Sequence, residues 1–337
     1  MATRGGIGGL ESHCFNLCRE LAAKGIEVHL LADQSYLSMQ ESLPQVQMHA
    51  FDFSKSRWNP FLLYQLYQCI KTIQPNLIHA QGGKASKIMA FLSSFIKQPT
   101  VATVHGMKNH LGDYKRFSAV IAVSGHVADK FKGLRSVDLI HNGVDIDPVL
   151  DRDQLVHQPR ALAIGRLDPV KGFDHLIKAW VGIDYRLDII GDGAEREHLQ
   201  AIIEQHQLQD RVRLLGYKHP VNLEICQSSF VVVSSLKEGG PIVVAEALLQ
   251  QVPIIATDVG MAKEFIPQQY IAKNNDVENL TKLIEFTLAH ISQLPEEFNT
   301  AYRVAADTLT LTKMTQKTIA VYQRQLQEKT AKESLKV

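Results

Sequence analysis

The stretch from Phe230 to Thr257 reads FVVVSSLKEGGPIVVAEALLQQVPIIAT. The apolar run at its start is typical of a strand that is buried on both faces of a parallel sheet. The pair Gly239-Gly240 predicts a turn, and Pro241 is a residue that the first turn of a helix favours. The apolar residues at the end of the stretch predict a second strand. The whole stretch therefore predicts a strand–helix–strand unit of an α/β fold.

Two carboxylates lie on either side of the predicted helix start, Glu238 in the turn and Glu246 inside the helix. The backbone N–H groups and the positive dipole end at a helix N-terminus favour phosphate. A carboxylate accepts paired hydrogen bonds, which suits neighbouring sugar hydroxyls. The pattern indicates a nucleotide-sugar site. The alternative is that Glu238 only favours the helix dipole and that Glu246 is a solvated helix residue.

A second motif, GRLDPVKG at residues 165–172, follows the first predicted strand of the second half of the chain. Arg166 and Lys171 would place two cations over one anion-binding crevice at the end of that strand. A diphosphate that leaves with developing charge needs such neutralisation. The alternative is surface charge beside a turn.

Short apolar strands alternate with helical stretches along both halves of the chain, which predicts two doubly wound, Rossmann-like α/β domains facing a central cleft. We expect an N-terminal domain at residues 1–147, a linker at 148–159, and a C-terminal domain at 160–310 that binds the nucleotide sugar. A long amphipathic tail, from Glu296 to Lys329, closes the chain, and its part at 311–337 is expected to pack back on the first domain.

The limits of each element follow from the apolar periods. The expected strands are 27–32, 46–51, 76–80, 100–105, 119–123, 137–141, 160–165, 187–191, 212–215, 230–234 and 253–257. The expected helices before the tail are 11–24, 60–73, 84–96, 126–132, 173–181, 195–206, 241–249 and 277–290.

Composition excludes several classes of protein. The chain has 337 residues with 45% hydrophobic and 21% charged residues, which is ordinary for a globular protein. No apolar run reaches the length of a membrane span, and the first residues do not form a signal peptide, so we expect a cytoplasmic location. The four cysteines show no metal-binding or disulfide pattern.

The net charge of +1 conceals a basic region. Residues 54–141 contain twelve Lys or Arg and three Asp or Glu. This excess suits an anionic acceptor or peripheral contact with an anionic membrane, with solvated helix faces as the alternative. Nucleic acid is not expected as a partner, because no recognition motif accompanies the charge.

The turn and helix with Glu238 and Glu246 resemble the E-x7-E donor site of retaining glycosyltransferases of family 4, which have the GT-B fold. The segment from Gly165 to Gly172 resembles the family's G-R-x-x-x-x-K-G motif, and GGLESHCFNLCRELAAKGIEVHLL near the N-terminus resembles its first helical segment. The resemblance covers nearly the whole chain.

This resemblance implies roles for particular residues. Arg166 and Lys171 would hold the donor diphosphate, Glu246 the ribose, and Glu238 would lie beside the donor sugar and phosphates. His105, at the end of a strand, would contact the transferred sugar, unless it is only a structural residue. The remaining residues expected at the donor are Gly8, Gly9, Gly165, Gly239, Gly240, Pro241 and Ile242.

The resemblance implies a metal-independent transferase with no cofactor besides its nucleotide-diphosphate sugar co-substrate. The acceptor would be a glycan or lipid-linked molecule in cell-surface polysaccharide or lipopolysaccharide synthesis. A nucleotide-sugar epimerase of the same fold and a non-catalytic nucleotide-sugar-binding subunit remain alternatives. The sequence departs from the family pattern at its start, because no apolar strand precedes Gly8, and the first strand of the N-terminal sheet is expected to be missing.

Overall fold

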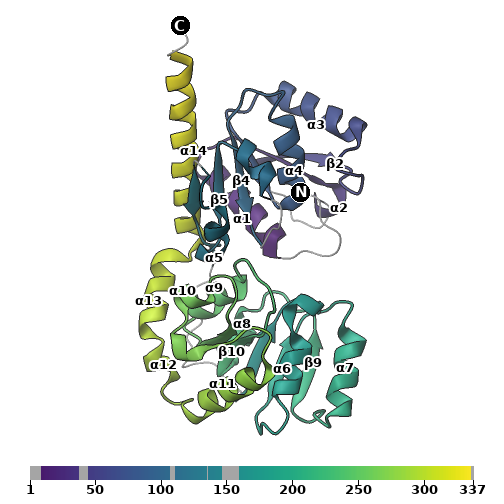
Figure 1. Cartoon of the computed structure of the whole chain (residues 1–337), viewed down its shortest axis with the longest axis vertical. Coiled ribbons are helices and arrows are strands. Elements are labelled where there is room, and N and C mark those ends of the chain that lie inside the picture. The colour runs from purple at the N-terminus through teal and green to yellow at the C-terminus, as the bar shows by residue number, and fades with distance from the viewer. Residues whose placement is uncertain (1–8, 38–44, 107–110, 135, 146–158, 335–337) are drawn as a thin grey trace. The chain divides into compact units, whose positions relative to one another are not determined.

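The computed structural model describes residues 9–37, 45–106, 111–134, 136–145 and 159–334. The chain forms two compact units (Figure 1). Unit 1 comprises residues 1–143 and 311–337, and unit 2 comprises residues 144–310. Each unit is an α/β fold with parallel strands, as the alternation of apolar segments predicts.

Unit 1 contains two separate parallel sheets. The first pairs β1 (Val28–Asp33) with β2 (Val46–Phe51) in the register Val28 to Val46. The second has the order β3-β4-β5-β6, formed by Ile78–Gln81, Thr100–Val104, Ala119–Ala122 and Val137–Leu139. No strand of the described residues joins β1 to β3. Residues 1–8, where the sequence departs from the family pattern, lie outside the described residues.

The helices of unit 1 agree in part with the prediction, because the segments predicted at 11–24, 60–73, 84–96 and 126–132 are present to within a few residues, whereas α2 was not predicted. They are α1 (Gly9–Ala23), α2 (Gln34–Leu37), α3 (Pro60–Ile73), α4 (Gly83–Leu92), α5 (Gly125–Ala128) and α14 (Leu311–Ser334), with 3-10 turns at Gly112–Arg116 and Asp129–Phe131. The bounds of α3 match because Asn59 caps it, accepting from the Leu62 N–H at 3.0 Å, and Pro60 opens it.

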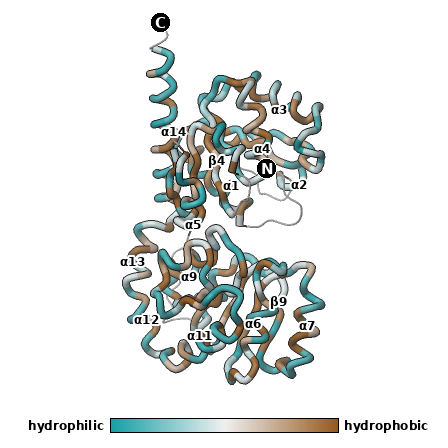
Figure 2. The backbone as a smooth tube through the Cα atoms, viewed as in Figure 1, coloured by the Kyte–Doolittle hydropathy of each residue, from teal (hydrophilic) through white to brown (hydrophobic). Residues whose placement is uncertain are grey.

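The amphipathic tail predicted from Glu296 to Lys329 forms three helices. These are α12 (Leu294–Glu297), α13 (Asn299–Thr308) and α14. The helical conformation is interrupted at Leu309-Thr310. The Leu309 carbonyl accepts a hydrogen bond from the Val144 N–H at 3.0 Å, and Thr310 forms a β-bridge with Val144. Helix α14 packs on α1 through Leu311, Met314 and Val321, and its C-terminal turns are hydrophilic (Figure 2).

Unit 2 has one six-stranded parallel sheet in the order β12-β11-β10-β7-β8-β9. Its strands are β7 (Ala161–Ile164), β8 (Leu187–Ile190), β9 (Val212–Gly216), β10 (Phe230–Val233), β11 (Ile254–Thr257) and β12 (Ile271–Ala272). Its other helices are α6 (Phe173–Ala179), α7 (Arg196–Gln205), α8 (Asn222–Gln227), α9 (Ile242–Leu249), α10 (Ala262–Phe265) and α11 (Val277–Ala289), with 3-10 turns at Pro169–Lys171 and Gln268–Tyr270. The central strands are fully buried, as in a parallel sheet covered on both faces.

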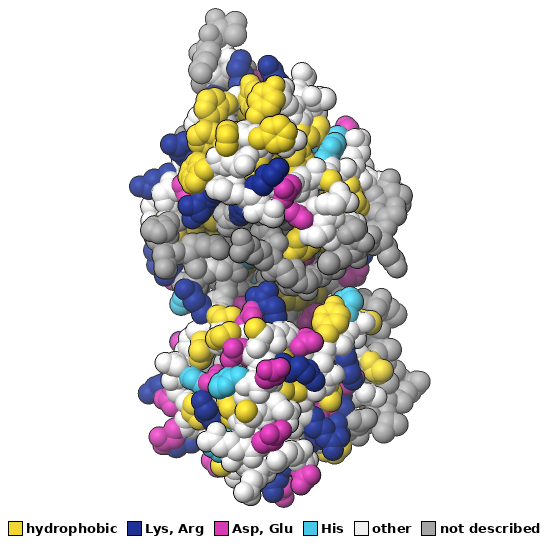
Figure 3. All heavy atoms as spheres, turned by 90° about the vertical axis from the view of Figure 1, so that its right-hand side faces the viewer, with side chains coloured by type: hydrophobic (Ala, Val, Ile, Leu, Met, Phe, Trp, Pro, Cys, Tyr) yellow, Lys and Arg dark blue, Asp and Glu magenta, His cyan; other side chains and the backbone are white. Residues whose placement is uncertain are grey.

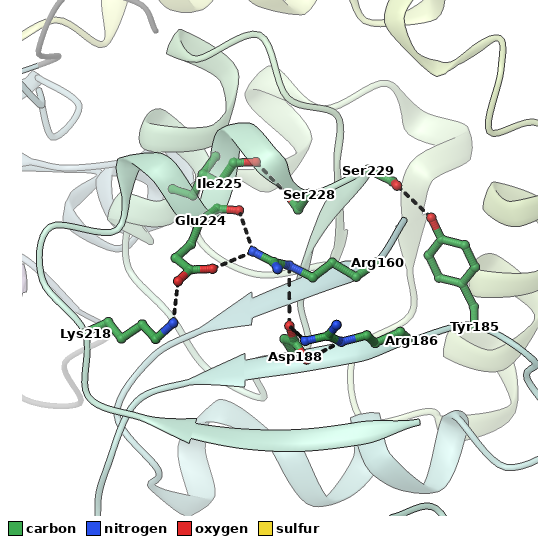
Figure 4. Close-up of polar contacts among 9 residues, drawn as sticks. All are labelled: Arg160, Tyr185, Arg186, Asp188, Lys218, Glu224, Ile225, Ser228 and Ser229. Carbon is green, nitrogen blue, oxygen red and sulfur yellow. Dashed lines mark hydrogen bonds and ion pairs between the residues drawn. The ribbon is translucent and has the colours of Figure 1, made fainter. Parts of the chain in front are cut away.

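A buried ion-pair network lies among the residues that enter these strands (Figure 4). Asp188 of β8 is inaccessible, accepts from Arg186 at 2.9 and 2.8 Å, and lies 3.4 Å from Nε of the buried Arg160. Arg160 also pairs with Glu224 at 2.5 Å, and Lys218 donates to the same carboxylate. The network gives each of the two buried charges, the Asp188 carboxylate and the Arg160 guanidinium, partners of opposite charge.

We therefore expect Asp188→Asn to lower the free energy of unfolding by about 2 kcal/mol, because the substitution leaves Arg160 with a weaker partner. Denaturant unfolding measures the change. Asp184→Asn is the matched control, because Asp184 is 94% exposed and pairs with Arg211 at 3.4 Å. Equal midpoints for the two variants would contradict this role of Asp188.

Candidate functional site

The candidate site lies where the strand order of unit 2 reverses. The chain runs outward from β7 to β9 on one side and from β10 to β12 on the other, and β7 pairs directly with β10. The loops that follow two such neighbouring strands diverge and leave a crevice at their carboxyl ends, where ligands bind in open α/β sheets. The loops after β7 and β10 carry the two predicted motifs.

The loop after β7 is held by backbone contacts with the turn that follows β8. The Gly165 N–H donates to the Ile190 carbonyl at 3.0 Å, and the Leu167 N–H donates to the Asp192 carbonyl at 2.9 Å. Gly191 has φ +147°, and a Cβ there would lie 1.8 Å from the Gly165 oxygen. Gly191 is therefore needed for the close approach of the two backbone segments, which is a structural role.

The structure brings Lys171 and Glu238 together, although they are 67 positions apart. The Lys171 ammonium donates to the Glu238 carboxylate at 2.5 Å, and both side chains are largely buried. The Ser235 hydroxyl donates to the same carboxylate oxygen at 3.3 Å. Gly172 has φ +62°, and a Cβ there would lie 2.4 Å from the Ser234 backbone oxygen. Glycine at this position therefore lets the turn that carries Lys171 approach the end of β10.

Arg166 differs from Lys171 in its exposure. Its side chain is 62% exposed and its Nε donates to the Asp168 carboxylate within the same loop. Asp168 was not expected from the sequence, where it looked like part of a turn. Because the Arg166–Asp168 ion pair is largely solvated, breaking it costs little free energy. The Arg166 guanidinium can therefore turn toward a bound anion.

The N-terminus of α9 lies directly after Glu238. Pro241 is the N-cap residue, the helix begins at Ile242, and no side chain of the described residues caps this terminus. Gly239 and Gly240 form the turn before it. Gly260, in the loop after β11, packs against this turn, since a Cβ there would lie 2.9 Å from the Gly239 oxygen. The arrangement presents a helix terminus that favours an anion.

Glu246 lies one turn into α9. Its carboxyl is partly buried, and burial raises its pKa to about 7. Within the part of the chain that the structure describes, no cation or hydrogen-bond donor contacts this carboxyl. Buried carboxyls normally have such partners, so an unpaired one at a helix terminus is suited to accept from a ligand's hydroxyls.

The structure places His105 in unit 1, just after β4. Its Nε2 donates to the Gln81 side-chain oxygen at 2.8 Å, and its ring lies edge-on to His13 with centroids 4.5 Å apart. Gln81 also contacts His79 at 3.4 Å, and His79 meets the Tyr322 hydroxyl of α14 at 2.5 Å. These contacts fix the orientation of the His105 ring.

Burial lowers the pKa of His13 to about 4 and that of His79 to about 3, so both rings are neutral at physiological pH. The sequence did not indicate that Gln81 or Tyr322 supports His105. Gln81 could have been found in the same way as His105, because each is a polar residue at the end of a predicted strand. The contact from Tyr322 could not, because it depends on the tertiary fold.

If His105 contacts the ligand as the family resemblance implies, we expect His105→Ala to lower the kcat of the enzyme about tenfold, as the loss of one ligand hydrogen bond would. Steady-state kinetics at saturating donor measures the effect, and Gln81→Leu should reproduce part of it by freeing the ring. His198→Ala, an exposed histidine of α7, is the control. Wild-type kcat in His105→Ala would remove His105 from the site.

The remaining predicted residues are Gly8 and Gly9. Gly9 is the first residue of α1 and is exposed, so it belongs to the helix and not to a turn before it. Gly8 lies outside the described residues. Among the described residues, no group of three or more His, Cys, Asp or Glu side chains is arranged to hold a metal ion.

A doubly wound unit with paired charges and a helix terminus at its switch point is typical of nucleotide-binding α/β proteins. Two family models match the chain, Glycosyltransferase Family 4 at residues 7–148 and Glycosyl transferases group 1 at residues 151–303. The chain therefore belongs to the family 4 glycosyltransferases, and it is a transferase with the GT-B fold, as its sequence predicts.

Similar proteins agree with this assignment. The N-acetylgalactosamine-N,N'-diacetylbacillosaminyl-diphospho-undecaprenol 4-alpha-N-acetylgalactosaminyltransferase of Campylobacter jejuni is 24% identical, with 75% of this chain and 78% of the relative covered. The lipopolysaccharide core biosynthesis glycosyltransferase LpsD of Rhizobium meliloti is 25% identical, with 63% of this chain and 64% of the relative covered. The crystal structure of Anabaena HepE in complex with UDP has a TM-score of 0.80 at 20% identity and covers 96% of this chain and 98% of that chain.

None of the helices in the described residues is both long enough and apolar enough to cross a bilayer.

Proposed function

We propose that the chain is a retaining glycosyltransferase that moves a sugar from a nucleotide-diphosphate sugar to a hydroxyl of a glycan or lipid-linked acceptor. The observation that carries this proposal is the Lys171–Glu238 pair at the switch point of unit 2, next to the uncapped start of α9. Cations and a helix terminus suit a diphosphate, whereas carboxylates suit sugar hydroxyls.

In the proposed reaction the acceptor oxygen bonds to the anomeric carbon while the bond from that carbon to the diphosphate oxygen breaks. Lys171, Arg166 and the N–H groups at the start of α9 stabilise the negative charge that the diphosphate gains. Glu246 accepts hydrogen bonds from the ribose hydroxyls, and Glu238 orients Lys171 beside the donor sugar.

Retention of configuration is proposed to follow from front-face attack, in which the departing phosphate oxygen takes the proton of the acceptor hydroxyl. The two glutamates have separate tasks in this scheme, and neither acts as the nucleophile of a double displacement. Lys171 and Arg166 supply the positive charge that a metal would otherwise supply, so transfer is expected to persist in excess chelator.

The acceptor class is supported by the names of the relatives. The Campylobacter protein is named for transfer to a diphospho-undecaprenol-linked sugar, and the Rhizobium protein is named for lipopolysaccharide core biosynthesis. We propose a cell-surface polysaccharide or lipopolysaccharide acceptor and peripheral contact with an anionic membrane. The basic excess of residues 54–141 suits both.

The test is incubation of the chain with UDP-, GDP- and ADP-sugars, with and without lipid-linked and glycan acceptors. Nucleotide release that requires an acceptor, with an anomerically retained product by NMR, is the expected result. Binding of a nucleotide sugar without turnover on any acceptor would contradict transfer and would favour a non-catalytic subunit. An inverted product would contradict the retaining mechanism alone.

A further inference from the structure

A patch of exposed aromatic side chains lies on unit 1 around α3 and α4. Trp58 precedes α3, and Phe61 and Tyr64 lie on its outer face, with exposed fractions of 56%, 59% and 60%. Phe91 is the last residue but one of α4, and Phe95 follows the helix, with exposed fractions of 36% and 60%. In Figure 3 hydrophobic side chains gather on the upper part of the surface with Lys and Arg at their edge. Contiguous exposure of large apolar side chains marks an interaction site.

Three of the five rings of this aromatic patch contact one another, between the start of α3 and the end of α4. Trp58 meets Phe91 edge-on with centroids 5.8 Å apart, and Phe91 lies 5.5 Å from Phe95. Helix α3 is anchored through its opposite face, where Leu62, Leu66 and Ile70 are buried in the core. The outer face is therefore held toward solvent by the same packing that stabilises the helix.

Cations surround the aromatic patch. The Arg57 guanidinium lies 5.6 Å from the Trp58 ring centroid, and the Lys55 ammonium lies 5.5 Å from that of Phe61. Lys71 on α3 and Lys97 after Phe95 are exposed. Lys55 also pairs with Asp52 at 3.4 Å. Between Phe53 and Gly112 the sequence contains no Asp or Glu, so the net charge of this segment is positive.

We propose that the aromatic patch and its flanking cations form the docking surface for an anionic lipid bilayer. Aromatic rings with polar tips, such as Trp and Tyr, favour the headgroup region, and Lys and Arg are attracted to anionic lipids. A protein partner is less favoured, because protein interfaces are depleted in Lys. The inference deepens the proposed function by naming where a lipid-bearing surface is met, but its test needs neither donor nor acceptor.

The chain offers a local reporter of this contact. It has two tryptophans, Trp58 and Trp180, and Trp180 is fully buried. We expect the full chain to sediment with phosphatidylcholine vesicles only when they contain phosphatidylglycerol, and added salt should weaken the binding. Binding should shift the tryptophan emission to the blue, and brominated lipid should quench it. Trp58→Phe should bind nearly as well but lose this shift.

Two variants separate the apolar and charged contributions. Trp58→Ala/Phe61→Ala/Phe95→Ala and Arg57→Gln/Lys71→Gln/Lys97→Gln should each lower the vesicle partition coefficient at least about tenfold. Tyr217→Ser/Leu223→Ser, which removes exposed apolar side chains of unit 2, should not lower it. Transfer to a water-soluble acceptor should be unchanged in all three variants, so that a failure of catalysis and a failure of docking are distinguishable.

Three results would overturn the inference. The first is no binding of the wild type to anionic vesicles, and the second is binding that the aromatic triple variant leaves intact. The third is a dimer, detected by sedimentation without lipid, that the triple variant abolishes, since the aromatic patch would then be an interface between two copies of the chain.

Discussion

Lys171→Ala should lower kcat for sugar transfer about 10³-fold, because it removes a preorganised charge from the leaving diphosphate. The midpoint of thermal unfolding should fall only modestly, since the Glu238 carboxylate left behind keeps the Ser235 hydroxyl as a donor and is 18% exposed. Steady-state kinetics with a nucleotide sugar and acceptor measures the loss. Lys178→Ala is the matched control, because Lys178 is an exposed lysine of α6 that pairs with Asp174 at 3.2 Å.

A double variant separates catalysis from charge balance. If Lys171 only neutralised Glu238, then Lys171→Ala/Glu238→Gln would remove both charges and restore transfer. We expect no restoration, because the diphosphate itself needs the cation. Recovery of most of the wild-type kcat in the double variant would reassign Lys171 to a structural role and would remove the central residue of the proposed site.

Much of the candidate site could be predicted because each motif is local. The glycines, Pro241 and the apolar strands beside them indicate where the backbone turns, and this placed the loops after β7 and β10 at strand ends. The direct pairing of Lys171 with Glu238 could not be predicted, because it depends on the adjacency of β7 and β10. That adjacency is a property of the sheet order, which strand periodicity does not contain.

The details of the fold that the sequence did not predict have similar causes. The amphipathic tail was predicted without internal boundaries, and the helices α13 and α14 are separated where Val144 pairs with Leu309 and Thr310. Tertiary contacts override local propensity there. The strand β12 was not predicted, because a strand of two residues is too short to show an alternation of apolar and polar side chains. The GT-B fold and the family were nevertheless recognisable, because the E-x7-E and G-R-x-x-x-x-K-G segments are specific.

Glu246→Ala should lower kcat/KM for the nucleotide sugar about 10²-fold, through loss of charge-assisted hydrogen bonds to the ribose. In the wild type, affinity for the donor should rise with pH through about 7, because the ionised carboxylate is the better acceptor. Titration calorimetry with an intact nucleotide sugar measures this, and Glu246→Gln should abolish the pH dependence. A wild-type affinity that is flat from pH 6 to 8 would contradict the ribose contact.

The Glu246 carboxyl should affect stability in the opposite direction, so that the free energy of unfolding falls over the pH range in which donor affinity rises. Its pKa in the folded protein, about 7, lies above the ordinary value of 4.5 for a glutamate, so the folded state binds the proton more tightly than the unfolded state. Its contribution to stability is then fully present below pH 4.5 and is lost as the pH rises through about 7. Glu246→Gln should match the wild-type unfolding midpoint at pH 4 and exceed it at pH 8. A variant that is more stable and yet binds the donor more weakly is typical of a polar side chain kept for ligand binding, whereas a less stable variant at pH 8 would show that Glu246 serves the fold.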